Sequence, residues 1–168
     1  MSERERVIHT IEPVFSPDSR LLILGSFPSV ISRQEGFYYA NRRNRFWPIM
    51  ESLFSASLPD AEARKDFLLS NGIALWDVIA QCSIVSSSDA KIRDAIPNDI
   101  PSLIEKTRIN AVAANGRKAY ELYSRLIRDK TGIDAICLPS TSPANAGSSF
   151  ESLLEAWSII RSIVSFPL

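Results

Sequence analysis

Four short apolar runs, each bounded by turn-forming residues, constrain the fold of this chain more than any other feature of its sequence. They are Leu21–Leu24 before Gly25, Ile73–Val78, Ile109–Ala114 before Asn115-Gly116, and Ala135–Leu138 before Pro139. Unbroken apolar runs that are too brief for helices are typical of strands buried on both faces. Such strands pair in parallel and need helices on both sides of the sheet. We therefore expect an α/β protein, a three-layer α/β/α sandwich around a central, four-stranded, mainly parallel sheet.

Stretches with helical periodicity separate and follow these runs. They are Asn44 to Phe54, residues 59–70, Arg117 to Lys130, and Phe150 to Val164. No linker rich in glycine or proline divides the chain, and its length suits one core. We expect residues 1–168 to form a single domain, with residues 1–19 as a loosely ordered N-terminal extension. Residues 86–88 and 97–101 are predicted as surface loops.

The charges of the chain balance, which disfavours one broad class of protein. Among its 168 residues, 19 Lys and Arg stand against 19 Asp and Glu, a formal net charge of zero. A protein that coats a polyanion depends on a global excess of basic residues. Residues 20–45 nevertheless carry five arginines against one glutamate, a local charge of +4. This basic island predicts contacts with a few phosphates and a modest, salt-sensitive affinity.

Metal ligands and strong nucleophiles are scarce in the sequence. The single histidine, His9, lies in a polar stretch, and Cys82 and Cys137 are far apart. Zinc and iron–sulfur sites need more ligands at closer spacing, so we expect no metal, no cofactor, and two cysteines in the apolar core. The charged N-terminus lacks the apolar segment of a signal peptide, and no apolar run approaches the ~20 residues of a membrane span. We expect a soluble, cytoplasmic monomer.

The loops after the first and fourth strands carry the chemistry. Ligands of open α/β sheets bind beyond the carboxyl ends of the strands. The first loop contains Gly25 to Ser29 and then residues 36–47, where aromatics, asparagines and arginines crowd together. Aromatics stack on bases and arginines pair with phosphates, although core aromatics such as Trp47 and solvated arginines also explain the pattern. Residues 138–147, rich in hydroxyls and amides, either follow a phosphate backbone or merely connect a strand to a helix.

Four motifs, in the same order along the chain, resemble those of the uracil-DNA glycosylase superfamily. They are Leu22-Ile-Leu-Gly-Ser-Phe-Pro-Ser29, Tyr38-Tyr-Ala-Asn-Arg-Arg-Asn-Arg-Phe-Trp-Pro48, Ala74-Leu-Trp-Asp-Val78 and Leu138-Pro-Ser-Thr-Ser-Pro-Ala-Asn145. Within the superfamily they are most similar to the hypoxanthine-DNA (deoxyinosine) glycosylases, near the G:T/U mismatch-specific enzymes. Arg42 stands where the family usually has proline.

The resemblance implies a uracil-DNA glycosylase-like fold and a role in base excision repair. Such an enzyme flips a deaminated base, hypoxanthine or uracil, out of DNA and hydrolyses its N-glycosidic bond, which leaves an abasic site. Its partner is DNA that contains the deaminated base. The enzyme would be monofunctional, because these motifs hold no lysine poised to form a Schiff base.

The resemblance also implies which side chain handles the attacking water. Many relatives carry Asp or Asn at the first strand end, where this chain has Ser26 and Phe27. In the deoxyinosine branch an asparagine of the next motif does this work, and it maps to Asn44, with Asn41 as the second choice. Asn44 is also suited to be a helix N-cap, and the two roles are compatible.

The same resemblance implies which neighbouring residues bind the flipped base and which bind the DNA backbone. Phe46 is expected to stack on the flipped base, with a core position as its alternative, and Ser140 replaces a family histidine in stabilising the departing base. The base-binding residues would be Gly25, Ser26, Phe27, Phe46 and Ser140. The DNA-binding residues would be Tyr38, Tyr39, Arg42, Arg43, Arg45, Thr141, Ser142, Pro143 and Asn145, of which residues 142–145 form a wedge. Asp77 is expected to hold the motif loops by hydrogen bonds.

Two other functions stay open at this point. A catalytically silent nucleic-acid or nucleobase-binding module on the same fold is the main alternative, because the usual Asp or Asn and His are missing from their usual positions. A hydrolase that uses Ser26 or Ser140 ranks last, since no histidine is near and no Gly-x-Ser-x-Gly elbow is present.

Overall fold

The central sheet is the one that the apolar runs predict. The computed structural model describes residues 5–84 and 93–165. Within these ranges the sheet has four parallel strands in the order β3-β2-β6-β7. They are β2 (Leu21–Gly25), β3 (Ile73–Asp77), β6 (Ala111–Asn115) and β7 (Ala135–Leu138). Every residue of β2 is buried, as expected for a central strand with helices on both faces.

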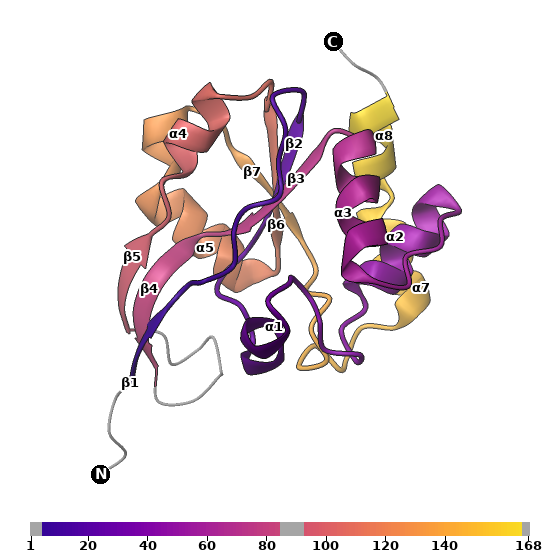
Figure 1. Cartoon of the computed structure of the whole chain (residues 1–168), viewed down its shortest axis with the longest axis horizontal. Helices are drawn as coiled ribbons and strands as arrows, with labels where there is room; N and C mark the ends of the chain where they lie inside the picture. The colour runs from indigo at the N-terminus through magenta and orange to yellow at the C-terminus, as the bar shows by residue number, and fades with distance from the viewer. Residues whose placement is uncertain (1–4, 85–92, 166–168) are drawn as a thin grey trace.

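Helices cover both faces of this sheet, which confirms the three-layer arrangement (Figure 1). One layer contains α2 (Phe46–Phe54), α3 (Ala61–Ser70), α7 (Phe150–Trp157) and α8 (Ile159–Ser165). The other contains α4 (Ile100–Glu105), α5 (Arg117–Leu126) and the short α6 (Arg128–Thr131). The helices expected over 117–130 and 150–164 are therefore each divided in two. The first division falls at Ile127, whose φ of −129° departs from helical geometry.

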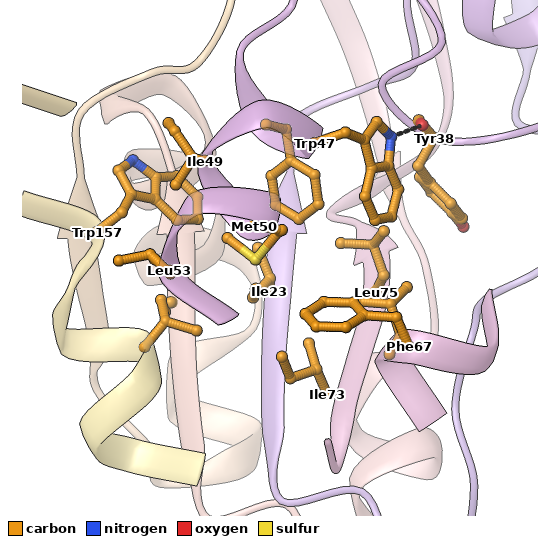
Figure 2. Packing of buried hydrophobic residues seen from close by; sticks show 14 of the residues in the cluster. Ile23, Tyr38, Trp47, Ile49, Met50, Leu53, Phe67, Ile73, Leu75 and Trp157 are labelled. Carbon is orange, nitrogen blue, oxygen red and sulfur yellow. Dashed lines mark hydrogen bonds between the residues drawn. The ribbon is translucent and has the colours of Figure 1, made fainter. Parts of the chain in front are cut away.

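Alternate residues of β2 point into two separate apolar cores. Ile23 packs with the residues of α2 and α7, among them Trp47 and Trp157, while Leu22 packs with Tyr123 of α5. Figure 2 shows the first core, where the Trp47 Nε1 donates a hydrogen bond of 3.0 Å to the Tyr38 carbonyl. The core position expected for Trp47 is confirmed. Because α2 is anchored by these rings, the residues just before it are held at a defined place on the sheet.

A second, antiparallel sheet was not predicted. It has the order β1-β4-β5 and is formed by β1 (Glu5–Ile8), β4 (Ile79–Ile84) and β5 (Arg93–Pro97). Polar residues interrupt β4, and its register against β5 shifts twice, so no regular alternation marks it in the sequence. Within the N-terminal extension, Glu5–Ile8 form β1, which pairs with β4, and Val14 forms a bridge with Leu75.

Two further expectations need correction. Residues 97–101 are not a loop throughout, because Pro97 ends β5 and α4 begins at the fully buried Ile100, capped by Asp99. Of the two cysteines, Cys82 is buried as expected, whereas Cys137 is exposed. Residues 86–88 lie outside the described residues. Across the described ranges, no helix combines the length and apolarity needed to cross a membrane.

Candidate functional site

Two long connections meet beyond the carboxyl ends of the central strands. The first joins β2 to α2 and contains α1 (Val30–Glu35), and the second, residues 139–149, joins β7 to α7. They lie side by side below the sheet in Figure 1, where the purple and orange segments meet. The Arg45 backbone N–H donates to the Thr141 carbonyl at 3.0 Å, which fixes one connection to the other.

Thr141 is the junction between three segments that are distant in sequence. It is completely buried, its hydroxyl accepts from the Asn115 Nδ2 at 2.9 Å, and the same hydroxyl donates to the Asn44 Oδ1 at 2.8 Å. The Thr141 N–H donates to the Asn115 Oδ1 at 3.0 Å. The ends of β6 and β7 and the start of α2 are thereby joined. A fully buried Thr141 does not fit the expected contact with DNA.

The amide of Asn44 is held in one orientation by this junction. Its Oδ1 accepts from both the Thr141 hydroxyl and the Phe46 N–H, the latter at 2.9 Å. Asn44 thus satisfies the N–H of Phe46, the first residue of α2, but the N-cap of this helix is Arg45 and not Asn44 as expected. Two donors occupy the Oδ1, and the Nδ2 makes no hydrogen bond to any residue that the structure describes. The side chain therefore presents a donor, rather than an acceptor, for a further partner.

Arg45 holds the second connection instead of extending into solvent. Its guanidinium donates to the backbone carbonyls of Ser142, at 3.1 Å, and of Asn145, at 2.8 Å, and also to that of Ser148. One planar group with several donors is suited to satisfying several carbonyls of a loop that forms no regular structure. These contacts occupy the donors expected to bind a phosphate, so Arg45 is a structural residue of the loop.

The loop after β7 is also fastened from within. The Asn145 Nδ2 donates to the Ser140 carbonyl at 2.9 Å and to the Ser148 hydroxyl at 3.1 Å, while the Ser142 N–H donates to the Ser140 hydroxyl at 3.1 Å. Ser142, Pro143 and Asn145 are each partly exposed. The loop that is expected to form the wedge is therefore braced by its own hydrogen bonds and is partly exposed.

Tyr38 is a core residue and not a surface contact. It is 2% exposed, and its hydroxyl donates to the Glu12 carbonyl at 3.0 Å and lies 3.3 Å from the Ile11 carbonyl. Burial, and then the nearby Asp77 carboxylate, raises the pKa of Tyr38 far above its ordinary value. The hydroxyl therefore stays protonated as a donor to the N-terminal segment, and the expected contact with DNA does not fit this placement.

Tyr39 covers the ring that was expected to stack on the base. Phe46 is completely buried, with Trp47 and Trp157 against its edges and Tyr39 stacked on it at a centroid distance of 4.3 Å. Tyr39 itself is only partly buried, and its φ of 53° lies in the left-handed region. That conformation costs a non-glycine residue about 1–3 kcal/mol and often marks a functional site. In this structure the face of Phe46 is not open to a base.

The Tyr39 hydroxyl and the Asp77 carboxylate both lie close to Gly25. A β-carbon on Gly25 would lie 2.3 Å from the Asp77 Oδ1 and 3.2 Å from the Tyr39 hydroxyl oxygen. Only glycine allows this close approach. Gly25 and Asp77 are paired residues of β2 and β3. We refer to Gly25, Tyr39, Asn44, Asp77 and Thr141 as the strand-end cluster.

His9 reaches the strand-end cluster, which the sequence did not suggest. Its Nε2 lies 2.8 Å from the Asp77 Oδ2. The half-buried Phe27 packs edge-on against the imidazole at 6.0 Å between centroids. Ser26 is buried, and its carbonyl accepts from the Ile79 N–H at 3.0 Å. Because β1 was not predicted, no pattern in the sequence placed His9 near the end of β3.

The basic island is divided by the fold. Arg42 and Arg43 are exposed just before α2, and the Asn41 side chain accepts from the Arg43 N–H at 3.0 Å in a local turn. Arg20 precedes β2 at the opposite end of the sheet, where its Nη2 donates to the Val164 carbonyl. The Arg33 guanidinium lies over the Phe27 ring at 5.7 Å. Arg42 and Arg43 are therefore the cations of this island that are placed for phosphates near the strand-end cluster.

A cavity of about 440 Å³ adjoins the loop after β7. Its lining comprises Arg117, Cys137, Leu138, Pro139, Ser140, Ala144 and Asn145. Ser140 lines this cavity, whose lining includes no residue of the strand-end cluster. Over residues 5–84 and 93–165, no group of three His, Cys, Asp or Glu side chains is placed to hold a metal ion.

Replacing Thr141 with valine tests the junction. Thr141→Val keeps the shape but leaves the Asn115 Nδ2 and one site on the Asn44 Oδ1 unsatisfied, so we expect a loss of about 1–3 kcal/mol in the free energy of unfolding, measured by urea denaturation. Thr141→Ser keeps the hydroxyl and serves as the control. Equal stabilities of the valine variant and the unaltered protein would contradict the junction.

Three known proteins are similar to this chain over most of its length. The chain is 38% identical over 135 residues to a hypoxanthine DNA glycosylase of Methanosarcina acetivorans, with 79% of this chain and 84% of that protein covered. It is 32% identical over 139 residues to a hypoxanthine DNA glycosylase of Methanosarcina barkeri, with 81% and 87% covered. A solution NMR structure from Methanosarcina acetivorans, provisionally described as a uracil DNA glycosylase, matches with a TM-score of 0.78 and 34% identity, over 92% of this chain and 97% of that one.

The family model of the uracil DNA glycosylase superfamily matches residues 12–161. That span contains the whole strand-end cluster and both connections that meet beneath the sheet. The chain therefore belongs to the uracil DNA glycosylase superfamily.

Proposed function

We propose that this protein is a monofunctional DNA glycosylase that removes hypoxanthine from deoxyinosine in DNA and leaves an abasic site. The observation that carries the proposal is the Asn44 amide, fixed by Thr141 and the start of α2 so that its Nδ2 is available to a substrate. The two relatives named hypoxanthine DNA glycosylases support the choice of base. Uracil, which carries the same carbonyl beside a ring N–H, is the second candidate.

The flipped base would stack on Tyr39 and not on Phe46. Phe46 already lies beneath the Tyr39 ring and is sealed from solvent, whereas Tyr39 is partly exposed and lies over Gly25. Base–aromatic stacking contributes about 1–3 kcal/mol per base. The strained backbone of Tyr39 and the ring of Phe46 behind it hold this platform in place before a base arrives, so little ordering cost remains at binding.

Asn44 would act on the departing base as a hydrogen-bond donor. Breaking the N-glycosidic bond leaves negative charge on the base, and a donor fixed beforehand in a site shielded from water stabilises that charge in the transition state. The Nδ2 of Asn44 is such a donor. The alternative expected from the sequence, that Asn44 orients the attacking water, would need a free acceptor, and both lone pairs of its Oδ1 are occupied.

Contacts with DNA would come from two places around the strand-end cluster. Arg42 and Arg43 are exposed and supply positive charge for phosphates, while residues 142–145 form the partly exposed loop that fills the gap left by the flipped nucleotide. Arg45, Asn145 and Ser140 hold that loop by hydrogen bonds. A preformed wedge lowers the cost of ordering when the duplex is opened.

The activity itself is tested with labelled duplexes that contain a single deoxyinosine, deoxyuridine or unmodified base. We expect alkali to cleave the deoxyinosine strand after incubation with the protein, since an abasic site is labile to alkali, and we expect no strand cleavage before alkali. Binding to all duplexes without any cleavage would instead support the silent nucleic-acid-binding module.

Two substitutions of Asn44 distinguish the two roles of its amide. Asn44→Asp keeps an acceptor for Thr141 and Phe46 but loses the donor, so we expect the single-turnover excision rate to fall by about 10²–10³-fold, as after loss of one donor to a developing anion. The excision rate of Asn44→Ala should fall at least as far. Asn41→Ala, a substitution of a nearby asparagine, serves as the control.

If Asn44 instead oriented the attacking water, Asn44→Asp would keep an excision rate near that of the unaltered protein, because a carboxylate accepts a hydrogen bond from water more strongly than an amide does. That result would contradict the donor role. An intact rate for Asn44→Ala together with a large loss for Asn41→Ala would move the catalytic assignment to Asn41.

Removing the two exposed arginines tests the contacts with phosphate. For Arg42→Ala/Arg43→Ala we expect weaker binding of every duplex, whatever its base, and a dependence of log K on log salt that is shallower by about 0.9 per lost contact. The affinities are measured by fluorescence anisotropy over a salt series. Arg125→Ala, an exposed arginine in the last turn of α5, is the control, and an equal effect there would mean that only net charge matters.

A further inference from the structure

Tyr39 has a backbone conformation that is unfavourable for a residue with a bulky side chain. Its φ of 53° lies in the left-handed region. Two other non-glycine residues in the described ranges have a positive φ: Ser55 follows the last turn of α2, and Asp94 lies where the pairing of β5 is irregular. A helix end and a bulge account for those two. Tyr39 is at neither, and such strain persists only where the surrounding structure enforces it.

The peptide before Tyr39 is held by Trp47 of α2. The Tyr38 carbonyl accepts from the Trp47 Nε1 at 3.0 Å, the bond drawn between these two residues in Figure 2. Trp47 is 2% exposed and is packed within the first core. Because the φ of Tyr39 sets how this planar peptide is turned relative to its Cα, the bond from Trp47 restricts that angle.

The peptide after Tyr39 is held by Ser32 of α1. The Ala40 N–H donates to the Ser32 hydroxyl oxygen at 3.2 Å, and Ser32 is 3% exposed. The ψ of Tyr39 turns this second peptide, so the second bond restricts the second angle. Ser32 is itself fixed, since its N–H donates to the Ser29 hydroxyl at 3.1 Å and its carbonyl accepts from the Gly36 N–H at 2.8 Å. Side chains of two different helices thus hold the peptides on both sides of the Tyr39 Cα.

We propose that Ser32 and Trp47 are positioning residues that together hold Tyr39 in its left-handed conformation, so that its ring is ready to stack on the flipped base. The proposal rests on the proposed glycosylase function and on the stacking role of Tyr39 within it. With an ordinary negative φ, the Cβ of Tyr39 would point in another direction and the ring would leave Phe46.

A ring that is fixed beforehand leaves less ordering cost when the base arrives. Misplacing a group that orients the substrate can slow a reaction by about 10²-fold. The short helix α1 therefore serves to bring the Ser32 hydroxyl to the Ala40 N–H.

The test is a double-mutant cycle between Ser32→Ala and Tyr39→Gly, read out as the single-turnover excision of deoxyinosine. Ser32→Ala removes the acceptor for the Ala40 N–H, so we expect the rate to fall by about 10-fold, the effect of one buried hydrogen bond. Glycine adopts a positive φ without strain and has no ring to position. In the Tyr39→Gly background, Ser32→Ala should therefore change the excision rate by less than about twofold.

Ser29→Ala is the matched control. It removes the N-cap of α1 and a donor to the Ser32 hydroxyl but leaves the acceptor for the Ala40 N–H. We expect its excision rate to stay within about threefold of that of the unaltered protein, because loss of a cap acts on stability.

Two further measurements accompany the cycle. The affinity of Ser32→Ala for a duplex with an abasic site should stay within about twofold, because that duplex offers no base to stack. Urea denaturation measures the folding of each variant. If Ser32→Ala does not fold, Trp47→Phe enters the same cycle with the same expectation, since it keeps a ring but loses the donor to the Tyr38 carbonyl.

The possible outcomes are distinguishable. No excision by the unaltered protein would refute the glycosylase function, and the proposal with it. Where the unaltered protein excises the base, an unchanged rate for Ser32→Ala would overturn the proposal alone. Equal losses for Ser32→Ala in the tyrosine and glycine backgrounds would show a purely structural serine and overturn the proposal as well. A loss for Ser29→Ala as large as that for Ser32→Ala would overturn the specific role of the bond to Ala40.

Discussion

The hydroxyl of Thr141 lies where the ends of β6, β7 and the segment before α2 converge, and the rest of the candidate site depends on the hydrogen bonds that it makes. A buried hydroxyl needs both a donor and an acceptor nearby, and Asn115 and Asn44 supply them. The direction of each bond follows from the others. Asn115 donates to Thr141, Thr141 therefore donates to Asn44, and the Asn44 amide is left with its nitrogen outward. The hydrogen-bond network of Asn115, Thr141 and Asn44 thus determines that Asn44 offers the substrate a donor and not an acceptor.

The aromatic core also fixes the position of the Tyr39 ring, on which the flipped base is proposed to stack. Trp47 and Phe46 anchor α2 against the sheet, and Tyr39 rests on Phe46 with a left-handed backbone. The same packing that stabilises the domain therefore places Tyr39 over Gly25. Asp77 stands on the neighbouring strand in register with Gly25, and parallel strands bring their carboxyl ends to one edge. The donor of Asn44, the ring of Tyr39 and the carboxylate of Asp77 all derive their positions from this edge.

Much of the fold could be predicted from the sequence, because buried parallel strands leave unbroken apolar runs. Ala135–Leu138 is a strand over the predicted residues, whereas β6 starts two residues later than Ile109. The second sheet could not be predicted, since β4 is polar and irregular in register. Without it, His9 had no visible route to Asp77, from which 68 residues separate it.

The two loops singled out in the sequence do meet beyond the strand ends, but the packing of their individual residues could not be predicted. Residue type alone does not distinguish an arginine that binds phosphate from one that binds carbonyls, so Arg42 and Arg45 looked alike in the sequence. Likewise Tyr38, Tyr39 and Phe46 are adjacent aromatics, and only packing reveals that Tyr39 is the outermost ring over Phe46. Asn44 was predicted as the N-cap of α2, whereas in the structure it precedes the N-cap, Arg45, and accepts from the Phe46 N–H.

The most direct test of this account is a double-mutant cycle between Asn44 and Thr141, read out as the single-turnover rate of deoxyinosine excision. If Thr141 acts by fixing the Asn44 amide, the rate of Asn44→Ala/Thr141→Val should match that of Asn44→Ala alone, with a coupling free energy equal to the full effect of Thr141→Val. If the two substitutions instead lower the rate independently, so that their effects multiply, the Thr141 junction does not position Asn44 and the account is wrong.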